Sequence, residues 1–184
     1  MTMVDAWIPE NALRPEAEAR LLKEVTDILI RAEGYEPDNQ VAQSLTYLFL
    51  HRPAAVFVGG APSESPRYRI MSSAPEGQYT DAARAALVRE ITEAVARAEG
   101  VTFEQVARRV WIFPTEITEG EWGAGGRINR LADIHALLVG EHDRKTAEER
   151  LARRRREQAR EALAGSVDAL SGAAVGEERT AEDR

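Results

Sequence analysis

A unit of 26 residues occurs twice in this chain, in register and without gaps, at positions 66 residues apart. Residues 9–34 and 75–100 are identical at eleven positions, and most of the other positions carry residues of similar character. The identities in the first copy are Pro9, Glu10, Ala17, Ala19, Leu21, Glu24, Thr26, Arg31, Ala32, Glu33 and Gly34. Chance rarely produces such self-similarity, which indicates a duplicated supersecondary unit. We therefore expect two linked copies of one motif.

The first repeat, residues 1–60, predicts a strand, a helix and a further strand. Residues 3–8 are largely apolar and favour a strand, and Pro15 suits the first position of a helix over residues 15–32. The apolar residues of this helix recur at helical spacing and cover one face. After a polar connection, residues 45–50 and 56–58 predict a strand with a bend or a short hairpin.

The second copy predicts the same order of elements. Its strand covers residues 68–73, its helix is capped by Thr80 or Asp81 and ends near Gly100, and its second strand covers residues 109–113. Right-handed crossovers place both helices on one face of a single four-stranded sheet. The predicted fold class is therefore α+β, and the opposite face of the sheet needs a partner to cover it.

Composition excludes several classes of protein. The chain has 184 residues and is 43% hydrophobic, which is enough for one domain of ordinary size with an appendage. It has no cysteine, which excludes thiol nucleophiles, disulfides and most structural zinc patterns. The net charge of -7 argues against general affinity for nucleic acid. We find no signal-like or membrane-spanning apolar segment, so we expect a cytoplasmic protein without membrane contact.

The expected domain covers residues 1–137. Its repeats span residues 1–60 and 67–118, and a Gly-rich loop or hairpin follows at residues 119–127. A short helix at residues 131–138 closes the domain. The Gly-rich loop does not match a phosphate-binding loop, because no Lys-Ser/Thr follows it.

The composition changes to Arg, Glu and Ala after the domain. This change predicts a charged, solvated helical extension over residues 138–164 and a disordered tail over residues 165–184. The basic run Arg153 to Arg156 shares its helix with several glutamates and lacks interleaved aromatic residues, which argues against nucleic-acid binding.

Several short motifs resemble the tautomerase superfamily. They are Met1-Thr2-Met3-Val4-Asp5-Ala6-Trp7-Ile8-Pro9-Glu10, Leu13-Arg14-Pro15-Glu16, His51-Arg52-Pro53, Val58-Gly59-Gly60, Pro66-Arg67-Tyr68-Arg69 and Trp111-Ile112-Phe113-Pro114-Thr115-Glu116. Over residues 1–137 the sequence is most similar to the fused two-repeat members, which include cis-3-chloroacrylic acid dehalogenase. The resemblance implies a tautomerase-like fold of two linked βαβ units and a homotrimer.

The resemblance also implies an amino-terminal proline, exposed by removal of the initiator methionine, whose secondary amine acts as base, acid or nucleophile. This chain has Thr2 at that position. Other positions of the dehalogenase pattern differ as well. The helix histidine corresponds to Leu29, the arginine pair to positions near Pro75 and Gln78, and the fourth-strand tyrosine to Phe113.

Three interpretations of Thr2 follow. In the first, Met1 is removed and the primary amine of Thr2 acts as a weak acid or base, or forms an imine with a carbonyl substrate. In the second, the Thr2 hydroxyl is a nucleophile with its own amine as base. In the third, Thr2 is only a strand-favouring residue and the site is silent. Glu121 is the position that matches the family's catalytic glutamate.

Three arginines beside strand ends are candidates for binding a substrate carboxylate, because guanidinium groups bind carboxylates in bidentate fashion. They are Arg52, Arg67 and Arg69. In the repeat, Tyr68 matches Thr2 and Arg69 matches Met3, so both occupy the second copy's version of the active-site position. The alternative for each arginine is a salt bridge at the surface or at a subunit interface.

Three further residues are candidates for the substrate-binding wall. Phe113 takes the family's tyrosine position, and Trp122 and Arg127 beside the Gly-rich loop are suited to reach across a subunit boundary. Structural packing is the alternative for the tryptophans. The chain has only three histidines, spread far apart, so we expect no metal and no cofactor.

The sequence therefore predicts a tautomerase-like isomerase or lyase that acts on a small carboxylate-bearing enol or unsaturated acid through its amino-terminal amine. The competing hypothesis is a catalytically degenerate binding or structural subunit that lacks the proline. We expect a homotrimer, with a heteromer containing a proline-bearing paralogue as the alternative assembly.

Overall fold

A four-stranded mixed sheet forms the centre of the molecule. The computed structural model describes residues 2–182, with side chains described through residue 166. The strands are β1 (Met3–Trp7), β2 (Tyr47–His51), β5 (Tyr68–Pro75) and β6 (Val110–Ile117), in the order β2-β1-β5-β6. Within each repeat the two strands are parallel, and β1 and β5 join the repeats as antiparallel neighbours. The α+β class predicted from the repeat is confirmed.

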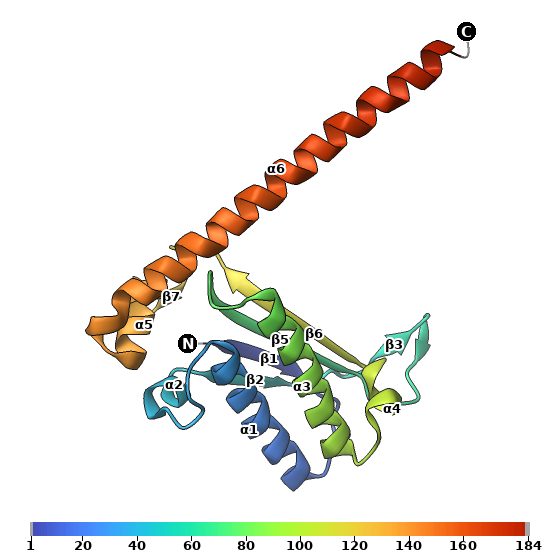
Figure 1. Cartoon of the computed structure of the whole chain (residues 1–184). Helices are drawn as coiled ribbons and strands as arrows, with labels where there is room; N and C mark the ends of the chain where they lie inside the picture. The colour runs from blue at the N-terminus through green and yellow to red at the C-terminus, as the bar shows by residue number, and fades with distance from the viewer. Residues whose placement is uncertain (1, 183–184) are drawn as a thin grey trace.

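Two long helices, α1 (Pro15–Ala32) and α3 (Asp81–Glu99), cover one face of this sheet (Figure 1). Pro15 begins α1, where its missing N–H removes no intrahelical hydrogen bond. The hydroxyl of Thr80 accepts a hydrogen bond from the Ala83 amide at 3.1 Å and caps α3. Gly100 ends α3 with φ 75°, a left-handed conformation that glycine adopts without strain.

The core lies between the sheet and these two helices, and equivalent positions of the two repeats fill it. Leu21 and Leu87 are each 1% exposed, and Val25 and Ile91 lie buried one helical turn further on. Alternate strand residues point toward the helices, as the pleat of a strand requires. The buried strand residues of this core are Val4, Ala6, Tyr68, Ile70, Ala74 and Val110.

Two reciprocal ion pairs show that an approximate two-fold axis relates the repeats. Arg31 of α1 contacts Glu90 of α3 at 2.8 Å, and Arg97 of α3 contacts Glu24 of α1 at 2.5 Å. Arg31 and Arg97 share one repeat position, and Glu24 and Glu90 share another. Each copy's arginine therefore meets the other copy's glutamate, as two-fold symmetry requires.

Short elements connect the main ones. The helices α2 (Gln40–Ser44) and α4 (Phe103–Ala107), which periodicity does not predict, are capped by the side chains of Asn39 and Thr102. The strands β3 (Phe57–Val58) and β4 (Ala61–Pro62) form a hairpin after β2, and β7 (Gly123–Ala124) and β8 (Arg127–Ile128) form another in the Gly-rich segment.

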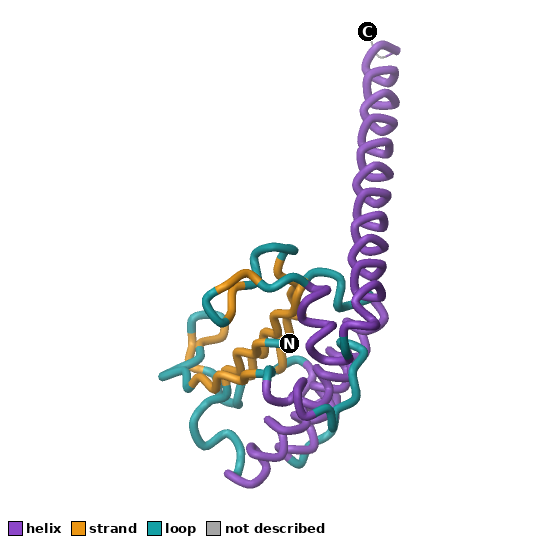
Figure 2. Tube along the Cα trace, turned by 90° about the vertical axis from the view of Figure 1, so that its left-hand side faces the viewer, coloured by secondary structure: helices purple, strands orange, loops and turns teal. Residues whose placement is uncertain are grey.

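The chain ends in α5 (Leu131–Val139), the 3-10 turn η1 (Glu141–Asp143) and α6 (Arg144–Glu182). Figures 1 and 2 show α6 beginning beside the body of the molecule and then projecting away from it. The helix continues past residue 164, where composition predicts a disordered tail. Within the described part of the chain, no helix is long and apolar enough to cross a membrane.

The prediction of a solvated extension needs correction for the first turns of α6. Ala147 is completely buried, and Leu151 packs so closely on Gly77 that a Cβ at Gly77 would lie 3.2 Å from the Leu151 Cα. Arg155 also reaches the carboxylate of Glu76, which follows β5. The start of this helix is therefore part of the domain's packing.

The face of the sheet opposite the two long helices carries exposed apolar side chains. Trp111 is 66% exposed and packs edge-on against Phe113. The exposed apolar residues of this open face are Met3, Tyr47, Phe49, Trp111 and Phe113. A contiguous apolar surface of this kind is typical of an interaction site.

Candidate active site

Thr2 lies immediately before β1 and is 1% exposed. Its carbonyl oxygen accepts a hydrogen bond from the Tyr47 amide at 3.2 Å, which continues the pairing of β1 with β2. Thr2 lines a cavity of about 410 Å³ together with Glu121 and Trp122. The structure therefore brings these three sequence-predicted residues to one place.

The segment after β6 positions Glu121 and Trp122. The Glu121 amide donates to the Thr118 carbonyl at 2.9 Å in a tight turn, and the Trp122 carbonyl accepts from the Asn129 amide at 2.8 Å. The Trp122 side chain packs on a small apolar cluster formed by α1, α2 and α5. Packing from three helices therefore holds this wall of the cavity.

A buried group of hydroxyls lies on the helix side of Thr2. Ser72 of β5 is completely buried, and Tyr79, in the loop before α3, is 2% exposed. Burial raises the pKa of the Tyr79 phenol far above its ordinary value, the negative charge of Glu33 raises it further, and the neighbouring hydroxyls of Ser72 and Thr2 lower it. No described residue provides a hydrogen bond of good geometry for these three hydroxyls.

A chain of polar contacts begins at Glu33 and at Gln78, which is beside Tyr79 in the sequence, and leads to the surface. The Gln78 amide nitrogen donates to Glu33 Oε2 and to the Tyr35 hydroxyl, each at 3.4 Å. The Tyr35 hydroxyl lies 2.8 Å from Nδ1 of His135, and Nε2 of His135 lies 3.0 Å from Asp143. Burial raises the pKa of the Glu33 carboxyl.

Motif-based reasoning does not select most of these polar residues as site residues. Ser72, Tyr79 and His135 carry no local sequence signal, because a lone polar residue in an apolar pattern has many explanations. Glu33 does carry one, since it belongs to the Arg-Ala-Glu-Gly sequence that ends both repeats. Gln78 is marked only as a position near the family's arginine pair.

Two of the predicted arginines are held by other contacts. Arg52 forms a bidentate pair with Glu18, at 2.7 and 2.6 Å, and Arg67 donates to the Arg108 carbonyl at 3.3 Å. Arg52 lies beside the far end of β1 from Thr2. The structure does not bring either residue to the Thr2 cavity of the same subunit.

Arg69, Tyr68 and Phe113 also lie away from that cavity. The Arg69 guanidinium lies over the ring of Trp7 at 4.6 Å and over that of Phe113 at 5.6 Å. The Tyr68 hydroxyl donates to Glu99 at 2.5 Å. Arg67, Tyr68 and Arg69 line a second cavity of about 480 Å³ beside the hairpin β3–β4.

Arg127 lies on the exposed hairpin β7–β8. Its Nε donates to the Asn129 side chain at 3.3 Å, and it lines a separate cavity that also includes Arg144. Its partner across the hairpin, Ala124, lines both this cavity and the Thr2 cavity, as does Leu45.

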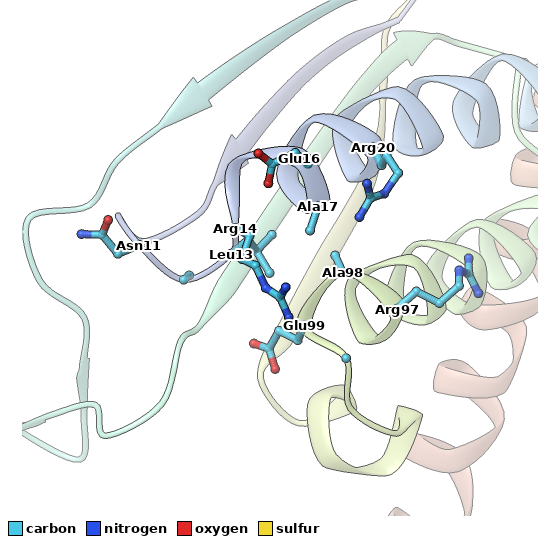
Figure 3. A pocket seen from close by; sticks show the side chains of 11 residues that line it. Asn11, Leu13, Arg14, Glu16, Ala17, Arg20, Arg97, Ala98 and Glu99 are labelled. Atoms are coloured by element: carbon cyan, nitrogen blue, oxygen red, sulfur yellow. The ribbon is translucent and has the colours of Figure 1, made fainter.

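A further cavity, of about 610 Å³, lies between the start of α1 and the end of α3 (Figure 3). Its charged side chains include Arg97, which is paired with Glu24, and Glu99, which is paired with Arg109. None of the predicted site residues lines it. Among the residues that the structure describes, no group of three or more acidic, histidine or cysteine side chains could hold a metal ion.

Solved structures with the same architecture are tautomerase-superfamily proteins. N1, a member of the cis-3-chloroacrylic acid dehalogenase family, is 13% identical, and the match covers 80% of this chain and 99% of N1 with a TM-score of 0.57. Pt0534, in a structure described as inactivated by 2-oxo-3-pentynoate, is 18% identical over 69% of this chain and 95% of its own, with a TM-score of 0.56.

Q0, described as a fused 4-OT that forms a symmetric trimer, is 19% identical, and the match covers 69% of this chain and 94% of Q0 with a TM-score of 0.54. No protein-family model matches the sequence, and no curated protein matches it. The likeness is one of architecture. The chain has the tautomerase-superfamily fold, in its fused two-repeat form.

Proposed function

We propose that this protein is a tautomerase-type isomerase or lyase that acts on a small carboxylate-bearing enol or unsaturated acid. The observation that carries the proposal is the position of Thr2, at a cavity of about 410 Å³ that Glu121 and Trp122 also line. The proposal takes Thr2 as the terminal residue after removal of Met1. Its primary amine is then the reactive group of the site.

The residues of the cavity suit proton transfer to a small unsaturated acid. An α-amine has an ordinary pKa of about 8 and therefore exchanges protons near neutral pH. Glu121 is exposed at the cavity and supplies a second proton-transferring group or activates a water molecule. Trp122, Tyr47 and Ile117 provide apolar walls for the carbon chain of the substrate.

A neighbouring subunit is the proposed source of the cation that binds the substrate carboxylate. The described residues that line the Thr2 cavity include no Lys or Arg. Arg69 is the best candidate among the predicted arginines, because it is exposed on the open face and forms no ion pair with any described residue. The apolar open face and the trimer described for Q0 support a homotrimer in which that face is covered.

Two measurements test the proposal. Mass spectrometry of the native amino terminus shows whether Met1 is removed, and its retention excludes amine chemistry at Thr2. Treatment with 2-oxo-3-pentynoate at alkaline pH, where the amine loses its proton, followed by peptide mapping, is expected to label the Thr2 amine, because the activated alkyne adds to an unprotonated amine. Labelling of surface lysines alone contradicts the proposal.

Turnover is measured with phenylenolpyruvate and 2-hydroxymuconate by following ketonisation. We expect activity in the wild type, a large loss in Glu121→Gln, and no loss in Glu148→Gln, which removes the same charge from the exposed side of α6. Activity that appears only in Thr2→Pro means that the pocket is intact and that the Thr2 amine does not replace the amine of the family's proline.

The second candidate function is a catalytically degenerate binding or structural subunit, either alone or with a proline-bearing paralogue. One structural observation favours it: Leu29, at the family's histidine position, is completely buried in the apolar core. Equal inactivity of the wild type and of Thr2→Pro, with retained folding, supports this candidate against the first.

A further inference from the structure

The second repeat shows which residues meet at the start of the first strand of each unit. In that repeat, the hydroxyl of Tyr68 donates to the carboxylate of Glu99 at 2.5 Å. Tyr68 occupies the repeat position of Thr2, and Glu99 occupies the repeat position of Glu33. Because an approximate two-fold axis relates the two units, the residue at the start of β1 and the glutamate at the end of α1 are expected to be neighbours as well.

Tyr79 gives independent support for this proximity. Its hydroxyl lies against the Thr2 and Ser72 hydroxyls, and the charge of Glu33 is close enough to affect its titration. Thr2 and Glu33 are 1% and 3% exposed. Both residues are therefore buried, and both lie close to Tyr79.

The two units differ in the partner of the glutamate. In the second unit, Arg109 pairs with Glu99 through its two terminal guanidinium nitrogens, at 2.8 and 2.5 Å. In the first unit, the neutral amide of Gln78 donates to Glu33. The first unit thus keeps the glutamate and presents a neutral amide to it, where the second unit presents an arginine.

The orientation of Gln78 is set by a chain of residues that ends at the surface. With the Nε2 proton of His135 directed at Asp143, Nδ1 accepts a hydrogen bond from the Tyr35 hydroxyl. The Tyr35 oxygen then accepts from the Gln78 amide nitrogen. This leaves Gln78 Oε1 as a buried acceptor for which no described residue provides a donor.

We propose that Glu33 and Gln78 form an acceptor site for the amine of Thr2 and hold that amine in its protonated, ammonium form. Glu33 is then a positioning residue that determines the chemistry of the amine. This inference rests on the proposed function only in taking Thr2 as the terminal residue. An ammonium group has no free electron pair, so the arrangement opposes imine formation and suits donation of a proton to a substrate carbon.

Several other groups face this site from the elements packed against it. Tyr35 follows α1, Tyr79 lies in the loop before α3, His135 lies on α5, and Arg150 of α6 donates to the Glu33 carbonyl at 3.4 Å. Arg150 opposes the proposed effect, because its positive charge disfavours a second cation nearby. Burial opposes it as well, because desolvation disfavours the charged forms of both the amine and the Glu33 carboxyl. The proposal requires the attraction between the ammonium group, the Glu33 carboxylate and the Gln78 carbonyl to outweigh both.

The test is a titration of the Thr2 amine by NMR in protein labelled with nitrogen-15 threonine, after mass spectrometry has established the terminal residue. In the wild type we expect the amine to titrate above the ordinary value of about 8 for an α-amine. In Glu33→Gln we expect its pKa to fall by at least about one unit, a tenfold change in proton affinity. The matched control is Glu36→Gln, which removes the same charge from an exposed position three residues away and is expected to leave the titration unchanged.

Three results overturn the inference: retention of Met1, a wild-type amine that titrates at or below about 8, or equal titration in the wild type and Glu33→Gln. A wild-type amine that titrates at or below about 8 overturns the inference even where Glu33→Gln fails to fold. The readout does not require turnover. A raised amine pKa in a protein that is inactive on every acid tested supports this inference and contradicts the proposed function. An ordinary amine pKa in an active protein supports the proposed function and contradicts this inference.

Discussion

The guanidinium of Arg155 donates to both carboxylate oxygens of Glu76, at 3.0 and 3.1 Å, across 79 residues of sequence. Glu76 also accepts from the Glu119 amide at 2.9 Å, so one carboxylate joins α6, the end of β5 and the segment after β6. The loop that follows Glu76 carries Gln78 and Tyr79. The start of α6 therefore supports the loop that borders Thr2.

Arg155→Ala is expected to lower the free energy of unfolding modestly at pH 7, because the pair is bidentate but the arginine is half exposed and solvent screens it. The hydrogen bonds from Arg155 are the main reason that the pKa of Glu76 lies below its ordinary value. A glutamate with a depressed folded-state pKa stabilises the fold fully above its unfolded pKa of about 4.3, and the contribution is lost as the pH falls through the folded value.

Urea denaturation of the wild type and Arg155→Ala at neutral and at acidic pH measures this effect. The difference between the two proteins is expected to shrink below about pH 4. Arg153→Ala is the matched control, because Arg153 lies on the same helix and pairs with Glu157 of that helix, at 3.9 Å. A pH-independent difference, or an equal loss in Arg153→Ala, contradicts the assigned role of the pair.

Gly77→Ala is expected to destabilise the protein by about 1 to 3 kcal/mol. Gly77 has φ 92°, and an added Cβ would lie 3.2 Å from the Leu131 side chain and 3.2 Å from the Leu151 backbone. Gly125→Ala provides a control for backbone strain alone, because Gly125 has φ 61° and no atom within 4 Å of its added Cβ. Thermal unfolding should show the larger loss for Gly77→Ala, and equal losses argue against close packing of α6.

Leu21→Ala and Leu87→Ala are each expected to lower the free energy of unfolding by about 2 to 5 kcal/mol. The two leucines share one repeat position and are each 1% exposed, so the two losses should be similar. Leu163→Ala, at an exposed site on α6, should change the stability by less than about 0.5 kcal/mol. Denaturant unfolding measures all three, and a loss confined to one repeat contradicts the symmetry of the core.

Trp111→Asp is expected to convert the proposed trimer into monomers, because a charge in the middle of an apolar interface is left without a partner. Sedimentation velocity measures the change in mass. Leu137→Asp is the control, since Leu137 is an exposed apolar residue on α5, outside the sheet. A wild-type protein that sediments as a monomer contradicts the proposed assembly.

Local signals predicted the main elements well. Pro15, Thr80 and Gly100 mark helix ends that the structure places at those residues, because capping and backbone conformation depend on near neighbours. The same local signals do not predict the helices α2 and α4. Each has five residues, too few to show a helical period.

Charge patterns were less informative about α6. Its composition predicts a solvated helix, and Arg153 is exposed and pairs with Glu157 of the same helix. Arg155, two residues later on the same helix, meets Glu76 instead. Composition does not separate the two arginines, because only the path of the helix across the domain decides which of them reaches a buried carboxylate.

By itself the sequence determined the duplicated unit, the order of its strands and helices, and the place of Thr2 at the start of the first strand. These follow from periodicity, caps and internal repetition, which act over short distances or repeat in register. Only the tertiary structure decided that Thr2 shares a cavity with Glu121 and Trp122, and that Gln78 contacts Glu33. Such contacts join residues 45 or more positions apart, and the packing of helices on the sheet selects them from many chemically equivalent alternatives.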